Sequence, residues 1–357
     1  MSDADPRWSD LAAVLVGHAT RVRPGERVLV AMREPETFPL ACRVHEAVIR
    51  AGGLPQTIFA SARFDGTLLR LGSDEQVAWA PELETRAIDW ADVSIWLRGT
   101  ADPVETSGVS PDRLALHRAA MGTVSARRTE RTRWTLVRVP GKAFSQTAGM
   151  PLDEATERFF RACLIDWPAA AGEWRRVADR LAIGSQVRIT GPGTELAFST
   201  IGRRWVVGDG RINVPDGEVY TAPVDDSMEG EIAFGWPQVY AGQTFEEVRL
   251  RFRRGVVVEA AAARGEAALR AILAVDDGAR RVGEVGLGVN RALTRRFNDP
   301  LLDEKIFGTL HLALGRAYAE CGGINRSAIH WDLVQDLRDG GRIEVDGRPV
   351  FADGEYL

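Results

Sequence analysis

His311 and Tyr318 stand seven residues apart in the stretch DEKIFGTLHLALGRAY, which spans residues 303–318. The residues between them are mostly small or aliphatic, and Asp303 can cap a helix, so the stretch predicts a slim helix that runs to Tyr318. Positions i and i+7 of a helix lie on one face two turns apart, which would put the imidazole and the phenol on the same side. This pair suits a functional site. The alternative is that His311 is an ordinary buried histidine with a satisfied hydrogen bond and no role in function.

His330 and Asp332 form a second pair in SAIHWDLV, residues 327–334. The apolar content of this segment predicts a strand, in which residues i and i+2 project from the same face. Trp331 would then point the other way into packing. A His-x-Asp pair often provides two metal ligands because imidazole and carboxylate converge without backbone strain, although the same pattern also has structural uses.

Two glutamates upstream extend the set of candidate ligands. Glu218 follows a Pro-Asp-Gly turn at the mouth of an expected strand, and Glu284 is flanked by glycines that leave room around it. Each glutamate alone could be an ordinary surface residue. Together with the two histidines, Asp332 and Tyr318, they provide enough ligands for about two divalent ions that share a bridging carboxylate.

The runs around these residues occur in a specific order. They are PDGEVYTAP, GEVGLGVN, DEKIFGTLHLALGRAY and GGINRSAIHWD, within residues 215–332. In this order they resemble the aminopeptidase T family of metallopeptidases, and RPGERVLV near the start resembles the N-terminal domain of that family. The resemblance implies two divalent ions (zinc, cobalt or manganese), a small peptide substrate, and a homodimer.

Position by position, the resemblance also assigns roles to individual residues. The implied metal ligands are Glu218, Glu284, His311, His330 and Asp332, with Tyr318 as a further ligand or as a donor to the transition state. Glu284 is the expected bridge between the ions, and Glu284 and Tyr318 are the expected catalytic residues. The implied reaction is hydrolysis of an N-terminal residue by a metal-activated water.

The length of the chain and the run VGEVGLGVN differ from the longer peptidases, so the chain resembles a shorter branch of the family. That branch includes the 2,5-dihydroxypyridine dioxygenases, which cleave rings with one ferrous ion. The alternative function is therefore a dioxygenase with a single Fe(II) held by His311, His330 and Asp332. The presence of both Glu218 and Glu284 disfavours it, because two further carboxylates make room for a second ion. A non-catalytic binding protein with structural metals is a third possibility.

Length and composition limit the class of protein to which the chain can belong. The chain has 357 residues, of which 45% are hydrophobic and 27% charged, as in a soluble globular protein of two domains. The net charge of -5 argues against a nucleic-acid partner. Three widely spaced cysteines suit a reducing compartment, and no apolar stretch approaches the roughly 20 residues that cross a bilayer. These features predict a cytoplasmic protein without a membrane partner.

The elements that must position the site divide into two halves. Residues 1–180 alternate strands and helices, which predicts an N-terminal open α/β domain with parallel strands and a long final helix over 153–182. Residues 181–357 contain short segments with turn signals, including a hairpin turn at GPGTE, residues 191–195. They are expected to form a β-rich C-terminal domain that binds the metals.

Overall fold

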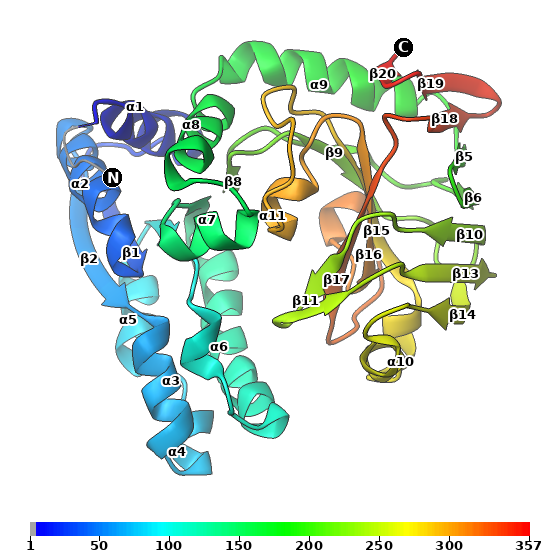
Figure 1. Ribbon diagram of the computed structural model, residues 1–357. Helices are drawn as coiled ribbons and strands as arrows, with labels where there is room; N and C mark the ends of the chain where they lie inside the picture. Colours follow the sequence, from blue (N-terminus) through cyan, green and yellow to red (C-terminus); the bar gives the residue numbers. More distant parts are fainter. Residues whose placement is uncertain (1–4) are drawn as a thin grey trace. The chain divides into compact units, whose positions relative to one another are not determined.

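The computed structural model describes residues 5–357, which form two compact units (Figure 1). The first unit extends to Ile165 and also takes in 210–215, and the second comprises 166–209 and 216–357. The boundary expected near 180 therefore needs correction, because it falls inside helix α9 (Trp167–Leu181) of the second unit. No helix in residues 5–357 is both long and apolar enough to span a membrane.

A parallel sheet forms the centre of the first unit, which confirms the predicted α/β layer. Its strand order is β2-β1-β3-β4-β8, and every neighbouring pair is parallel. The strands are β1 (Arg27–Arg33), β2 (Leu54–Ala60), β3 (Val93–Arg98), β4 (Arg133–Arg138) and β8 (Asn213–Val214). Buried apolar residues run almost without interruption along β1 and β3, as is typical of parallel strands covered by helices on both faces.

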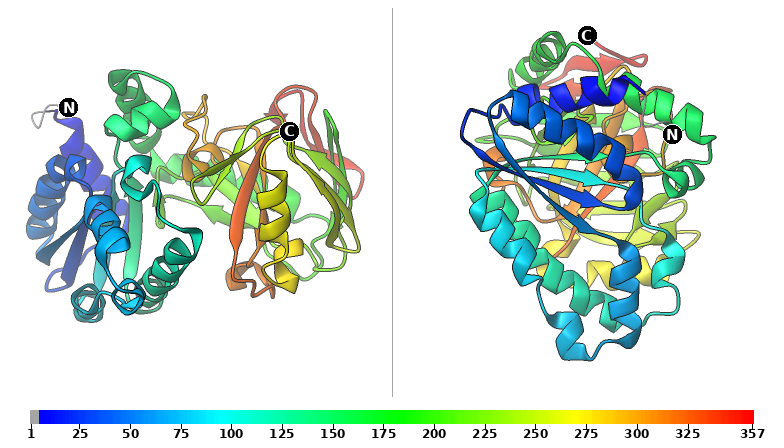
Figure 2. Two further views of the ribbon diagram at one scale, coloured as in Figure 1. Left: turned by 60° about the horizontal axis from the view of Figure 1, so that its bottom comes forward. Right: turned by 90° about the vertical axis from the view of Figure 1, so that its left-hand side faces the viewer.

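Helices flank this sheet (Figure 2). They are α1 (Arg7–Ala13), α2 (Phe38–Arg50), α3 (Ala62–Leu71), α4 (Asp74–Ala78), α5 (Glu82–Trp90), α6 (Pro111–Arg131), α7 (Lys142–Ala148) and α8 (Leu152–Cys163). Right-handed crossovers place α2 on one face of the sheet and α5 and α6 on the other. The single helix expected over 153–182 is broken into α8 and α9, because Pro168 starts a new helix that Asp166 caps.

The second unit is β-rich, as expected, and contains three sheets. An antiparallel sheet of five strands, which we call the site sheet, has the order β17-β16-β15-β9-β7. Its strands are β7 (Val206–Gly208), β9 (Glu218–Thr221), β15 (Val282–Gly288), β16 (Thr309–Gly315) and β17 (His330–Asp336). Helix α9 packs against β7 and β9, and the short helices are α10 (Glu266–Leu273) and α11 (Pro300–Asp303).

The larger sheet of this unit has eight strands, in the order β14-β13-β10-β6-β5-β18-β19-β20. They are β5 (Gln186–Gly191), β6 (Thr194–Ser199), β10 (Glu229–Ala233), β13 (Arg249–Arg253), β14 (Val256–Ala261), β18 (Arg342–Val345), β19 (Arg348–Ala352) and β20 (Glu355–Tyr356). The GPGTE turn joins β5 to β6 as predicted. A third sheet consists of β11 (Gln238–Tyr240) and β12 (Gln243–Phe245).

The helix expected to run to Tyr318 does not form, because His311 lies at the centre of strand β16. Alanine and leucine favour helices, but the leucines at 310, 312 and 314 also alternate with the period of a strand. Every residue of β16 is buried. The strand therefore lacks the exposed polar residues that would reveal its two-residue period in the sequence. Gly315, with a φ of 97°, ends the strand at its junction with the loop that carries Tyr318.

The strand predicted around His330 is confirmed as β17. Trp331 projects from the face opposite His330, where its ring centroid lies 4.7 Å from that of Phe245 and 5.2 Å from that of Tyr240. This packing fixes the strand so that His330 and Asp332 share the other face.

Candidate metal centre

The five predicted carboxylate and imidazole ligands come from four strands of the site sheet and lie on one of its faces, and Tyr318 lies in the loop after β16. Each long side chain stands directly opposite a glycine or alanine on a neighbouring strand. The pairs are Glu284 with Ala313, His311 with Gly286, His330 with Gly315, Asp332 with Ala313, and Glu218 with Gly288. Because opposed residues of an antiparallel pair share a face, the small residues leave the space into which the ligands converge.

Gly286 shows how tightly this space is filled. A Cβ atom at Gly286 would lie 2.1 Å from the imidazole of His311, which is fully buried. Gly286→Ala should therefore displace the ring and lower the affinity for zinc by about 10–100-fold in equilibrium dialysis. Gly172→Ala is the control, because a Cβ there meets no heavy atom of the described chain within 4 Å. Unchanged affinity in Gly286→Ala would remove His311 from the metal centre.

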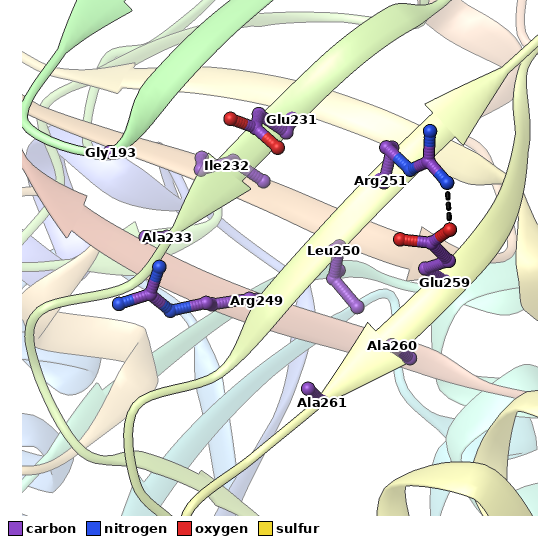
Figure 3. A pocket seen from close by; sticks show the side chains of 10 residues that line it. All are labelled: Gly193, Glu231, Ile232, Ala233, Arg249, Leu250, Arg251, Glu259, Ala260 and Ala261. Atoms are coloured by element: carbon purple, nitrogen blue, oxygen red, sulfur yellow. Dashed lines mark ion pairs between the residues drawn. The ribbon is translucent and has the colours of Figure 1, made fainter.

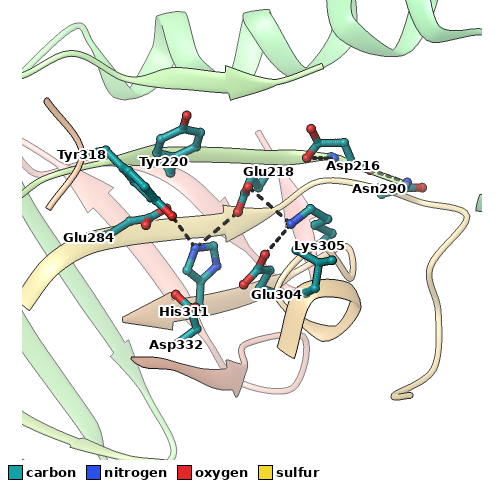
Figure 4. Close-up of polar contacts among 12 residues, drawn as sticks. Asp216, Glu218, Tyr220, Glu284, Asn290, Glu304, Lys305, His311, Tyr318 and Asp332 are labelled. Carbon is teal, nitrogen blue, oxygen red and sulfur yellow. Dashed lines mark hydrogen bonds and ion pairs between the residues drawn. The ribbon is translucent and has the colours of Figure 1, made fainter. Parts of the chain in front are cut away.

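Glu284 approaches both histidines, and Figure 4 shows it in the cluster with His311, Glu218 and Asp332. Its Oε1 is 3.5 Å from Nε2 of His311, and its Oε2 is 3.5 Å from Nε2 of His330. Glu218 approaches His311 with Oε2 at 3.4 Å, and Asp332 approaches His330 with Oδ1 at 3.5 Å. The structure thus brings the five predicted carboxylate and imidazole ligands together, with one oxygen of Glu284 facing each ring.

The surroundings of His330 set its orientation. Nδ1 lies 2.7 Å from the carbonyl oxygen of Arg316 and donates to it, which leaves Nε2 to face the carboxylates. The hydroxyl of Tyr318 lies 3.5 Å from the same Nε2. Burial and the charges of Glu284 and Asp332 raise the pKa of Tyr318, so its phenol keeps the proton. Tyr318 therefore stands at the edge of the cluster as a hydrogen-bond donor.

Two charged neighbours of the cluster, Glu304 and Lys305, were missed by the sequence analysis. Lys305 is fully buried, contacts the carboxylate of Glu304, and places Nζ 3.4 Å from Oε1 of Glu218. Burial alone would lower the pKa of Lys305, but the charges of Glu218, Glu304 and Asp216 raise it, and the amine stays protonated. The available signal was an adjacent acid and lysine at the start of an apolar segment, in a chain with only two lysines.

The donor set fits divalent metal ions. Two triplets, Glu218–Glu304–His311 and Glu284–His311–Asp332, each offer ligand atoms that lie within 4.8 Å of one another. Of their four carboxylates, Glu218 and Glu304 contact the amine of Lys305, and Glu284 and Asp332 face the histidine rings. Buried carboxylates are costly unless they are paired or coordinate a metal. Oxygen and imidazole donors together suit zinc, cobalt or manganese. The convergence of four carboxylates, three of them buried, is thus a second indication that cations bind here.

The protonation of the histidines predicts that metal affinity rises with pH. Burial alone would lower the pKa of both rings, but Glu284 and Glu218 raise that of His311 to about 9, and Asp332 and Glu284 raise that of His330 to about 10. Both rings therefore carry two protons in the metal-free protein at neutral pH, and a metal must displace one from each. The affinity should increase by about tenfold per pH unit for each ring, until the pH passes these pKa values. Calorimetry in buffers of different ionisation enthalpy counts the released protons, and a release of none would contradict the assignment.

A separate hollow of about 240 Å³ lies on the exposed face of the eight-stranded sheet (Figure 3). Its charged lining includes the ion pair between Arg251 and Glu259, and it contains no histidine. None of the candidate ligands lines it. It is therefore distinct from the metal centre.

Comparison with known proteins agrees with the fold and with a metal-dependent enzyme. The family described as "Thermophilic metalloprotease (M29)" matches residues 4–356, and the chain belongs to this family. It is 32% identical to "Aminopeptidase T" of Thermus aquaticus over 326 residues, which cover 79% of this chain and 78% of the relative. The solved structure "Wild-type AmpT from Thermus thermophilus" matches with a TM-score of 0.87 and 27% identity, over 98% of this chain and 99% of that one.

These matches confirm the expected metallo-aminopeptidase class. The structure of "2,5-dihydroxypridine Dioxygenase from Pseudomonas putida KT2440" also covers 100% of this chain, with a TM-score of 0.59 and 16% identity. That likeness shows a shared fold only. The dioxygenase alternative is not favoured, because the family and its curated relatives are peptidases.

Proposed function

We propose that this metallo-aminopeptidase holds two divalent ions and removes the N-terminal residue of small peptides. The observation that carries the proposal is the position of Glu284, with one carboxylate oxygen facing each of two imidazoles. Glu218 and His311 would hold one ion, with Glu304 as an additional candidate, and His330 and Asp332 would hold the other. Glu284 would bridge the two.

When bound, the ions would supply a water of lowered pKa and would polarise the carbonyl of the substrate. The side chains supply the remaining functions. Glu284, as the shared ligand, would hold the two ions side by side next to the substrate. The excess of carboxylates offers a charged partner for the free amino group of a peptide, which would restrict cleavage to the first residue.

Tyr318 is proposed to donate a hydrogen bond to the oxyanion that develops on the substrate. Tyr318→Phe should lower kcat by about 100-fold and leave KM and metal content nearly unchanged, because one oxyanion donor contributes about this factor in other hydrolases. Tyr220→Phe is the matched control, since its ring lies 6.0 Å from that of Tyr318 while its hydroxyl approaches Glu320. A loss of bound metal in Tyr318→Phe would instead make Tyr318 a ligand.

The substrate class is tested with a panel of amino-acyl amides after reconstitution with zinc, cobalt or manganese. Amides with a free amino group should be hydrolysed, and the same compounds with an acetylated amino group should not. Protein that binds two ions and leaves every free amide intact would refute the proposed substrate. Assembly as a homodimer stays a prediction from the family resemblance.

A further inference from the structure

Three arginines end three adjacent parallel strands in the first unit. Arg33 ends β1, Arg98 ends β3 and Arg138 ends β4. Their registers align, because Arg33 pairs with Arg98 and Arg98 pairs with Arg138 across the sheet. Residues paired in this way share a face, and like charges placed side by side are destabilising. Such a row requires compensating negative charge.

The chain supplies part of that charge through Glu84, which lies near the central arginine without bonding to it. Arg33 forms an ion pair with Asp65, in which Nη2 lies 2.6 Å from Oδ2. The side chain of Arg98 makes no hydrogen bond or ion pair within residues 5–357, and its Nε is buried without a partner. Burial, followed by the charges of Arg128, Arg138 and Arg33, lowers the pKa of Arg98 to about 9. Arg98 is thus a desolvated guanidinium near three other arginines and the single carboxylate of Glu84.

A cavity of about 310 Å³ lies beside these arginines. Arg33, Arg98, Arg118 and Arg138 line it, together with Trp96 and His117. The carboxylates of Glu34, Asp65 and Glu84 also line it, and Asp65 is paired with Arg33. It lies at the carboxyl ends of β1 and β3, and the strand order β2-β1-β3 shows that the direction of chain progression reverses between these two strands. Open α/β sheets bind their ligands in the crevice outside the carboxyl ends of the strands at such a reversal.

We propose that this cavity is a binding site for the carboxylate or phosphate group of a small molecule, held by the guanidinium of Arg98 between those of Arg33 and Arg138. The planar fork of arginine matches both groups, because each presents two oxygens to parallel N–H donors. The site belongs to the first unit, and all of the metal ligands belong to the second. It does not depend on the proposed peptidase chemistry.

The full-length protein is titrated by calorimetry with sodium phosphate and, separately, with sodium succinate, in chloride buffer of constant ionic strength. Saturable binding of at least one anion is expected, and the anion that binds more tightly identifies the chemical source. Because phosphate also binds divalent ions, the titrations are repeated after chelation, and binding at the arginine row should persist. Absence of saturable binding of both anions would overturn the proposal.

Arg98→Met should weaken this binding by at least about tenfold, since a charge-assisted hydrogen bond is lost. In chloride without the ligand, its thermal midpoint should equal or exceed that of the wild type, because the repulsion within the row is relieved. Arg253→Met, at an exposed arginine of β13, is the matched control and should bind as the wild type does.

If Arg98→Met does not fold, Arg98→Lys keeps the positive charge but lacks the planar guanidinium, and it should also bind at least tenfold more weakly than the wild type. Equal binding by the wild type and the folded Arg98 variant would overturn the assignment.

Discussion

Glu284→Gln is expected to lower kcat/KM for an amino-acyl amide by about 10³-fold, because the metal ions that Glu284 would hold supply several kcal/mol of transition-state stabilisation. The amide keeps the size of the side chain but cannot carry the negative charge that two cations share. The same variant should retain fewer than two ions per chain after dialysis, as measured by elemental analysis.

The control for this variant is Glu231→Gln, at an exposed glutamate of β10 on the eight-stranded sheet. It should leave both activity and metal content unchanged. The circular dichroism of both variants should match that of the wild type, because neither substitution changes side-chain volume. Full activity in Glu284→Gln would remove Glu284 from the reaction.

Lys305→Met should lower the free energy of unfolding of the metal-free second unit by about 3–5 kcal/mol. The loss is large because the substitution leaves Glu218 and Glu304 buried without the cation that lies between them. In the metal-loaded protein the loss should be smaller, since bound ions supply part of the missing positive charge. Urea denaturation with and without chelator measures both values.

Lys142→Met is a matched control, because Lys142 is the other lysine of the chain and is exposed in the first turn of α7. A surface substitution of this kind usually changes stability by less than about 0.5 kcal/mol. A similar small change in metal-free Lys305→Met would show that Lys305 does not balance the carboxylates of the centre.

The sequence predicted those strands whose residues show a clear apolar run between turn residues. Apolar runs bounded by turns identified β1 to β4 of the first unit, and the apolar content of residues 327–334 identified β17. The placement of His330 and Asp332 on one face followed from the two-residue period of a strand. The grouping of these residues with Glu218 and Glu284 was expected from four separate motifs and from the family they resemble.

Features that depend on long-range pairing could not be predicted in this way. The segment around His311 contains helix-favouring residues, and it becomes a strand because β15 and β17 hydrogen-bond to its two edges. The need for glycine at 286 follows from its register with His311, which no local pattern reveals. The sequence marks Lys305 as one of only two lysines, but its partner Glu218 is 87 positions away and is identified by the structure.

Anomalous diffraction from crystals of the metal-loaded protein tests the central claim most directly. Data collected at the absorption edge of the bound metal should show two peaks, with the carboxylate of Glu284 between them and the rings of His311 and His330 on opposite sides. A single peak held by the two histidines and Asp332, without contact to Glu284, would contradict the dinuclear centre, as would no peak at all.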